Sequence, residues 1–297
     1  IENIMPFYNE KFGVDGARLD MGHALPRELE LRIIRKAKER DPSFAIIAEE
    51  LVMGNDEKAR RSGYDCILGN TWWMEPRINE GKLKELLYEV LPSMRLPTLA
   101  GIETPDTPRA AARKNGRRFS RFATILNYFL PHGITYINSG QEIFEIQPMN
   151  LGLDNDEEGR YVLPPNDPFY GKLAFFDPYV LHWNADDDLI DLISLLSSIR
   201  RSNLDLLNSN NPKLLWEEDK TSVGLFYWNG VKGLLMVANG DFEAMKEFQI
   251  DLGFHTWRGN HKVQWKLKGF DGQSEWDVGG DFHLSLGPGE VAVAEVR

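Results

Sequence analysis

Short apolar segments alternate with amphipathic helical patterns along the first half of the chain, and this alternation constrains the fold most. Two helical patterns are clear, at residues 26–40 and 117–130. The apolar segments, predicted as strands, lie at residues 14–20, 44–48, 64–69, 98–102 and 134–137. Because strands that alternate with helices pair in parallel, we expect an α/β fold with a parallel sheet.

Acidic residues close three of the predicted strands. Asp20 ends the first strand, Glu49 follows the second, and Asp106 comes just after the fourth. One βα unit takes about 30 residues, so these acids fit three units of one barrel, with one unit skipped before Asp106. Barrels of this kind carry their chemistry at the carboxyl ends of the strands. The sequence therefore predicts three carboxylates on one face of a barrel.

Arg18 precedes Asp20 by two residues, so strand alternation puts both side chains on the same side. The pair is either a structural ion pair or part of a reaction site. Carboxylates beside an arginine fit retaining glycoside chemistry, in which a nucleophile and a proton donor lie about 5–5.5 Å apart. A metal site is the alternative, but the Arg18 cation would repel a metal ion, so we predict no metal and no cofactor.

Composition narrows the class of partner. The net charge of −11 argues against nucleic acid and anionic membranes as partners, and no apolar run is long enough to span a membrane. The single cysteine, Cys66, lies in an apolar strand, which fits a reducing compartment, so we expect a cytoplasmic protein. Trp72 and Trp73 are predicted in a loop, where their rings either stack on sugar or pack the loop itself.

The second half of the chain changes character. Residues 143–185 form a long irregular segment whose many aromatic residues favour an ordered, functional loop. The clearest later strands lie at residues 223–228, 234–238, 248–252 and 291–296, with a hairpin turn at Asn229-Gly230. We expect two domains: residues 1–208 with the βα units, and residues 209–297 as a small antiparallel β-sandwich.

The motifs around the acids resemble those of the α-amylase family, glycoside hydrolase family 13. Gly16-Ala17-Arg18-Leu19-Asp20 resembles the fourth-strand motif of that family, whose aspartate is the nucleophile. Ala48-Glu49 resembles the fifth-strand motif with the general acid/base. Thr104-Pro105-Asp106 stands at the seventh-strand motif, whose aspartate stabilises the transition state.

This resemblance implies a role for each candidate residue. It makes Asp20, Glu49 and Asp106 catalytic. We also expect substrate-binding roles for four further residues, of which the two tryptophans would stack on sugar rings: Arg18, His23, Trp72 and Trp73.

The resemblance also implies an architecture. Residues 133–142 resemble the eighth strand and its exit loop, so the chain matches strands 4–8 of a (β/α)8 TIM barrel followed by the family's C-terminal β-sandwich. The motifs of the first three strands are absent. We therefore expect the missing N-terminal half of the barrel to come from the full-length chain.

Departures from the family pattern suggest a subtype. Pro105 replaces the usual histidine of the seventh-strand motif, and Ala24 follows His23 where many hydrolases of the family have histidine. With the segments 103–109, 147–154 and 172–177, these features look most like the bacterial α-1,4-glucan maltosyltransferases. Such enzymes act by retaining double displacement and move maltosyl units between α-1,4-glucans and malto-oligosaccharides. An amylase-type hydrolase and a non-catalytic family member are the alternatives.

Overall fold

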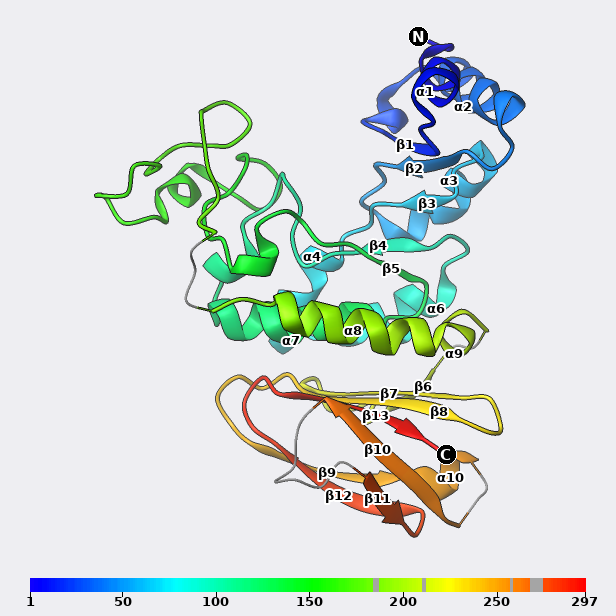
Figure 1. Ribbon diagram of the computed structural model, residues 1–297, viewed down its shortest axis with the longest axis vertical. Helices are drawn as coiled ribbons and strands as arrows, with labels where there is room; N and C mark the ends of the chain where they lie inside the picture. Colours follow the sequence, from blue (N-terminus) through cyan, green and yellow to red (C-terminus); the bar gives the residue numbers. More distant parts are fainter. Residues whose placement is uncertain (184–186, 210–211, 257–258, 268–274) are drawn as a thin grey trace.

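The structure is a computed structural model that describes residues 1–183, 187–209, 212–256, 259–267 and 275–297. Its first sheet has five parallel strands in sequence order (Figure 1). The strands are β1 (Gly16–Leu19), β2 (Ala45–Ala48), β3 (Cys66–Ile67), β4 (Thr98–Ala100) and β5 (Gly133–Thr135). The expected α/β arrangement with a parallel sheet is confirmed, whereas the numbering of these strands as 4–8 of a barrel stays a prediction.

Helices precede and separate the parallel strands. They include α1 (Ile4–Phe12), α2 (Arg27–Arg40), α3 (Asp56–Ser62) and α7 (Gly116–Tyr128). α1 ends at Gly13, whose φ of 65° lies in the left-handed region that glycine adopts readily. α2 buries Ile33, Ile34 and Ala37, which recur at helical spacing and so form one apolar face.

The prediction that Trp72 and Trp73 lie in a loop is wrong, because both residues belong to helix α4. A run of short helical segments fills this part of the chain: α4 (Thr71–Met74), η3 (Glu75–Glu80), α5 (Lys82–Glu85), η4 (Leu86–Val90) and α6 (Leu91–Ser93). Met74 and Ile78 both join the main hydrophobic cluster. Packing of these side chains holds residues 71–80 in helical turns that the local sequence does not predict, whereas the later turns agree with a helix expected at residues 81–92.

The later strands are antiparallel, as the sequence predicts. A six-stranded sheet contains β6 (Lys213–Leu215), β7 (Ser222–Trp228), β8 (Gly233–Asn239), β10 (His261–Leu267), β11 (Glu275–Val278) and β13 (Val291–Val296). β9 (Lys246–Asp251) pairs with β12 (Asp281–Leu286) in a second sheet. The hairpin at Asn229-Gly230 joins β7 to β8, and Gly230 has a φ of 94°. Helix α9 (Leu204–Ser209) lies across the expected domain boundary, which stays a prediction.

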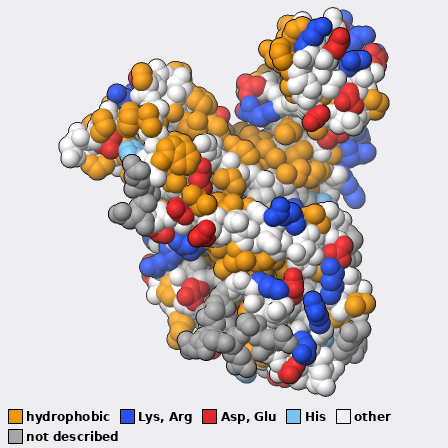
Figure 2. Space-filling model, in the orientation of Figure 1, with side chains coloured by type: hydrophobic (Ala, Val, Ile, Leu, Met, Phe, Trp, Pro, Cys, Tyr) orange, Lys and Arg blue, Asp and Glu red, His pale blue; other side chains and the backbone are white. Residues whose placement is uncertain are grey.

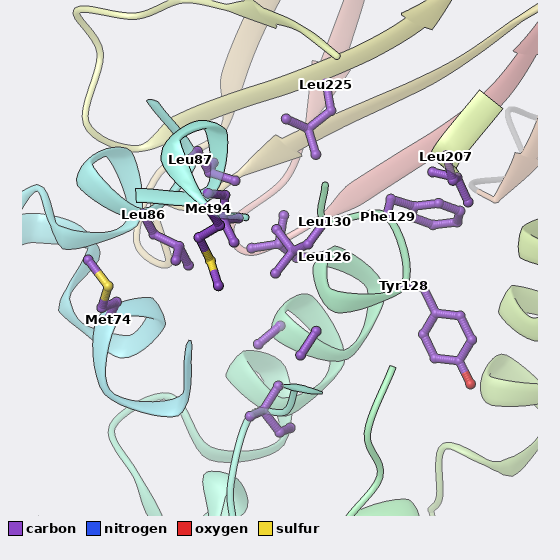
Figure 3. Close-up of a cluster of buried hydrophobic side chains, with 14 of the residues drawn as sticks. Met74, Leu86, Leu87, Met94, Leu126, Tyr128, Phe129, Leu130, Leu207 and Leu225 are labelled. Atoms are coloured by element: carbon purple, nitrogen blue, oxygen red, sulfur yellow. The ribbon is translucent and has the colours of Figure 1, made fainter. Parts of the chain in front are cut away.

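One hydrophobic cluster connects the two parts of the chain. Helices α7 and α8 (Ile190–Ser202) lie between the parallel sheet and the strands β7, β8 and β13 (Figure 1). Leu126 and Phe129, near the end of α7, share this cluster with Leu87 of η4 and Leu225 of β7 (Figure 3). Tyr227 adds a buried hydrogen bond, since its hydroxyl donates to the backbone oxygen of Phe129 at 2.7 Å.

Residues 143–183 form an irregular lobe, as expected; it begins at the last residue of η6 (Gln141–Ile143), and η7 (Glu157–Tyr161) is the one further helix of its described part. Residues 184 and 185 of the expected segment lie outside the described residues. Figure 2 shows the surface hollowed between this lobe and the N-terminal part of the chain. Among the described residues, no helix combines the length and apolarity that a membrane-spanning segment needs.

Candidate active site

The ends of β1 and β2 bring Arg18, Asp20 and Glu49 together. Leu19 and Ala48 are register partners in this parallel pair, so Asp20 and Glu49 emerge at the same end of the sheet. Arg18 donates from Nη1 to Asp20 Oδ1 at 2.5 Å, and its Nη2 lies 3.2 Å from Glu49 Oε1. One guanidinium group therefore contacts both carboxylates.

Glu49 is the more enclosed of these two acids. Its side chain is 12% exposed, compared with 71% for Asp20. The backbone N–H of Met21 donates to Glu49 Oε2 at 2.7 Å, and Met21 has a left-handed φ of 47° at the start of the turn after β1. The neighbouring Glu50 instead accepts a hydrogen bond from the Val52 N–H at 2.9 Å. The residue facing Arg18 is thus Glu49, and its role as proton donor stays a prediction.

His23 joins this cluster through the backbone of Glu49. It lies in η1 (Gly22–Ala24), and its Nδ1 is 3.2 Å from the Glu49 carbonyl oxygen. His23 and Glu49 also line a cavity of about 130 Å³, together with Glu30 and Tyr64. The structure therefore places His23 beside the two acids, while its binding of substrate stays a prediction.

Asp106 lies in the turn after β4, apart from the Arg18 cluster. Its N–H donates to Thr104 Oγ1 at 3.2 Å, and its Oδ1 accepts a hydrogen bond from Asn150 Nδ2 at 2.8 Å. Within the described chain, Asp106 makes no hydrogen bond or ion pair with Arg18. Its contact with Asn150 links it to the irregular lobe.

Tyr136 is a further polar residue that the charges of Arg18 and Asp106 reach, and sequence reasoning missed it. Burial raises the pKa of this phenol, and the negative charges of Glu103 and Asp106 raise the pKa further, while the positive charge of Arg18 opposes them. Tyr136 is therefore within electrostatic reach of both groups. The available signal was its position as the first residue after β5, equivalent to Asp20 after β1.

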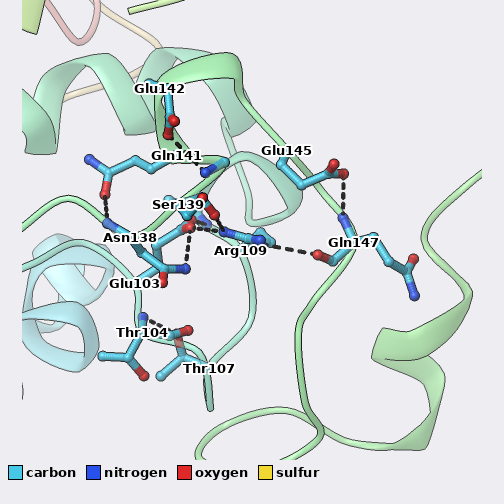
Figure 4. Close-up of polar contacts among 12 residues, drawn as sticks. Glu103, Thr104, Thr107, Arg109, Asn138, Ser139, Gln141, Glu142, Glu145 and Gln147 are labelled. Carbon is cyan, nitrogen blue, oxygen red and sulfur yellow. Dashed lines mark hydrogen bonds and ion pairs between the residues drawn. The ribbon is translucent and has the colours of Figure 1, made fainter. Parts of the chain in front are cut away.

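A buried ion pair underlies the turn that carries Asp106. Arg109 Nη1 lies 2.6 Å from Glu103 Oε1, and both side chains are 1% exposed. Glu103 also accepts a hydrogen bond from Asn138, and Arg109 donates to the carbonyl oxygens of Ser139 and Gln147 (Figure 4). The pair therefore fixes the turn after β4 against the loop after β5 and the start of the irregular lobe.

The irregular lobe has its own polar anchor at His182. Its Nδ1 lies 2.8 Å from Glu145 Oε2 and its Nε2 lies 3.2 Å from Asp167 Oδ2. Burial alone would lower the pKa of His182, but hydrogen bonds and negative charge from Glu145 and then Asp167 outweigh it, so the pKa is raised. A protonated His182 can donate to both carboxylates at once.

The ring contacts of the two tryptophans in the described chain do not include the three acids. Trp72 is 5% exposed, and the Trp73 ring packs against Arg77, whose guanidinium carbon is 4.2 Å from the ring centroid. Packing is thus the role that the structure shows, and stacking on sugar stays a prediction. Burial raises the pKa of the Cys66 thiol to about 12, so it is a poor nucleophile. The described residues contain no group of three or more His, Cys, Asp or Glu side chains arranged to hold a metal ion.

Solved structures match the chain, although no protein-family model and no curated protein matches its sequence. An Anoxybacillus α-amylase aligns with a TM-score of 0.71 and 16% identity over 100% of this chain and 62% of its own. An α-amylase from Geobacillus thermoleovorans, complexed with acarbose, aligns with a TM-score of 0.71 and 15% identity, over 100% of this chain and 63% of its own. The maltogenic α-amylase AmyB from Thermotoga neapolitana aligns with a TM-score of 0.69 and 15% identity, over 99% of this chain and 64% of its own.

The chain spans less than two thirds of the length of each of these enzymes. At identities of 15–16% the likeness concerns the course of the backbone, and the site residues need their own argument. The parallel sheet and the antiparallel sheets of this chain are both included in the aligned region, because the alignments cover 99–100% of it. The chain therefore has the fold of the corresponding part of the α-amylase structures.

Proposed function

We propose that the chain carries the reacting groups of an enzyme that acts on α-1,4-glucans by retaining double displacement. In this proposal the enzyme moves maltosyl units to glucan or malto-oligosaccharide acceptors. The observation that carries the proposal is the Arg18 guanidinium that contacts both Asp20 and Glu49 at the ends of adjacent parallel strands. Retaining chemistry needs two such carboxyl groups close together, about 5–5.5 Å apart.

In the first step Asp20 is the nucleophile and Glu49 the acid. An Asp20 oxygen attacks the anomeric carbon, and the bond from that carbon to the leaving oxygen breaks as Glu49 donates its proton there. Arg18 holds one oxygen of Asp20, whose side chain is 71% exposed and so accessible to a sugar. The product of this step is a glycosyl ester on Asp20.

In the second step Glu49 acts as the base. It takes the proton of an acceptor hydroxyl, whose oxygen attacks the anomeric carbon and releases Asp20 as a carboxylate. Two inversions at the same carbon retain the α configuration. Asp106 supports both steps from the turn after β4, because a carboxylate stabilises the positive charge that develops on the sugar ring.

Transfer and hydrolysis differ only in the acceptor. Bulk water is about 55 M, whereas a well-oriented acceptor can reach an effective molarity of 10⁵ M or more. The lobe of residues 143–183 supplies a wall next to Asp106, through the hydrogen bond from Asn150, and this supports a bound acceptor. Hydrolysis is the second candidate, because the matching structures described above are α-amylases.

Product analysis of the full-length protein tests the proposal. The protein is incubated with maltohexaose labelled at its reducing end, and the Asp20→Asn variant serves as the control without a nucleophile. Maltosyl transfer predicts labelled products that differ by two glucose units, with no net gain of reducing ends. Steady release of glucose or maltose with new reducing ends would favour hydrolysis. A wild-type protein that alters no α-1,4-glucan would refute the proposal.

A further inference from the structure

Asp106 is held by a residue outside the strand-end motifs. Asn150 Nδ2 donates to Asp106 Oδ1 at 2.8 Å, although the two residues are 44 positions apart in the sequence. This bond occupies one carboxylate oxygen and leaves Oδ2 for another partner. An amide donor fixes the plane of the carboxylate without neutralising its charge.

The backbone around Asn150 is built for this close approach. Asn155 Nδ2 donates to the Asn150 carbonyl oxygen at 3.0 Å, which closes the local turn. A Cβ atom at Gly152 would lie 2.9 Å from the backbone oxygen of Asp106, so only glycine lets the two segments pass here. Asn150 therefore meets Asp106 through a fitted backbone contact.

The far end of the same segment is fixed by two arginines. Arg77 Nη2 donates to Asp154 Oδ1 at 3.0 Å, and Arg113 Nη1 donates to Asp154 Oδ2 at 3.4 Å. Arg77 is itself held against the Trp73 ring. The segment from Asn150 to Asp154 is thus fixed to Arg77 of η3 and to Arg113 at one end and to Asp106 at the other.

We propose that Asn150 is a positioning residue that orients the Asp106 carboxylate for the reaction. Arg77 and Arg113 act further back, by holding Asp154 and with it the turn that presents Asn150. The inference rests on the proposed function, in which Asp106 stabilises the transition state. Asn150 would then affect the chemical step more than substrate binding, because Asp106 acts most strongly once charge develops on the sugar.

The test compares two variants of Asn150 in the full-length protein. Asn150→Ala removes the donor, and Asn150→Leu removes it while keeping the approximate shape of the side chain without adding a charge. Each should lower kcat about 10- to 100-fold, as expected for a hydrogen bond to a charged group, and leave KM within about 2-fold. Asn166→Ala is the matched control, because Asn166 is exposed in the same lobe and makes no hydrogen bond within the described chain.

A double-mutant cycle separates positioning from direct contact with the substrate. If Asn150 acts through Asp106, Asn150→Ala should have almost no further effect on kcat in the Asp106→Ala background. Additive losses would overturn the proposal, because they would show that Asn150 acts independently of Asp106. Unchanged kcat in both single variants would overturn it as well.

A crystal structure of Asn150→Ala distinguishes failure of this inference from failure of the proposed function. The inference expects the Asp106 carboxylate to leave the orientation it has in the wild type, whatever the substrate is. An unmoved Asp106 carboxylate in the variant would overturn it. Absence of glucan chemistry in the wild type, together with a displaced Asp106 in the variant, would refute only the proposed function.

Discussion

Replacing Arg109 by methionine should destabilise the protein strongly, because it leaves a carboxylate buried without its cation. Glu103 and Arg109 are each 1% exposed and lie 2.6 Å apart. In Arg109→Met, Glu103 keeps the N–H of Ala110 and the amide of Asn138 as donors. No positive charge remains in contact with it in the described chain.

The size of the effect follows from burial. Removing one partner of a buried ion pair costs about 3–5 kcal/mol, since the remaining charge has lost both water and partner. Arg109→Met also leaves the carbonyl oxygens of Ser139 and Gln147 without this donor. The matched control is Lys114→Met, which breaks a pair with Glu243 in which both side chains are at least 80% exposed, and it should change stability far less.

Urea unfolding followed by tryptophan fluorescence measures the difference in free energy of unfolding. The double variant Glu103→Gln/Arg109→Met should recover part of the loss, because its buried pair no longer contains an uncompensated charge. A loss below about 1 kcal/mol in Arg109→Met would refute the reasoning, since that is the range of an exposed pair. Lack of any recovery in the double variant would count against the charge as the cause.

Three other perturbations have clear expected outcomes. Glu49→Gln should lower the rate of the full-length enzyme at least 10²- to 10⁴-fold, whereas Glu50→Gln should have little effect; the reverse order would exchange their roles. Tyr227→Phe should cost about 1–3 kcal/mol in urea unfolding, because a buried carbonyl loses its donor. Because the folded state raises the pKa of His182, protonation of this residue stabilises the folded protein. This stabilisation is complete below about pH 6.5 and is lost as pH rises through the higher folded-state pKa. The melting temperature should therefore fall more between pH 6 and pH 8 in the wild type than in His182→Gln.

Local sequence patterns were enough to predict that Arg18 and Asp20 lie together at the end of a strand. Arg18 and Asp20 share one side of β1 because strand alternation acts over two residues, and the structure shows the expected ion pair. The structure shows that Glu49, and not its neighbour Glu50, contacts Arg18, while the role of Glu49 as proton donor stays a prediction. The contact between Arg18 and Glu49 itself depends on the register of β1 against β2, which a single strand cannot specify.

Contacts between distant segments were not predictable in the same way. Asn150 reaches Asp106 from an irregular lobe that has no hydrophobic period to fix its course. The helical turn at Trp72 and Trp73 was missed because the wider core, and not local propensity, holds it. Tyr136 looked like part of an apolar strand, and only the end of β5 at Thr135 places it among the site residues.

The second half of helix α7 is almost entirely buried, and this bears on whether the two parts of the chain can exist separately. Ten residues end the helix, from Phe119 to Tyr128. All of them are buried except the half-buried Arg121, and their apolar side chains join the cluster that packs both the parallel sheet and the β7–β8 layer. Neither part of the chain therefore has a complete hydrophobic core without the other. Cutting the chain after α9 would uncover α7 in the way that removing a subunit uncovers an obligate interface. Exchanging the β-sheet part for another would require a new complementary surface on α7, so the two parts are expected to be inherited, folded and lost together.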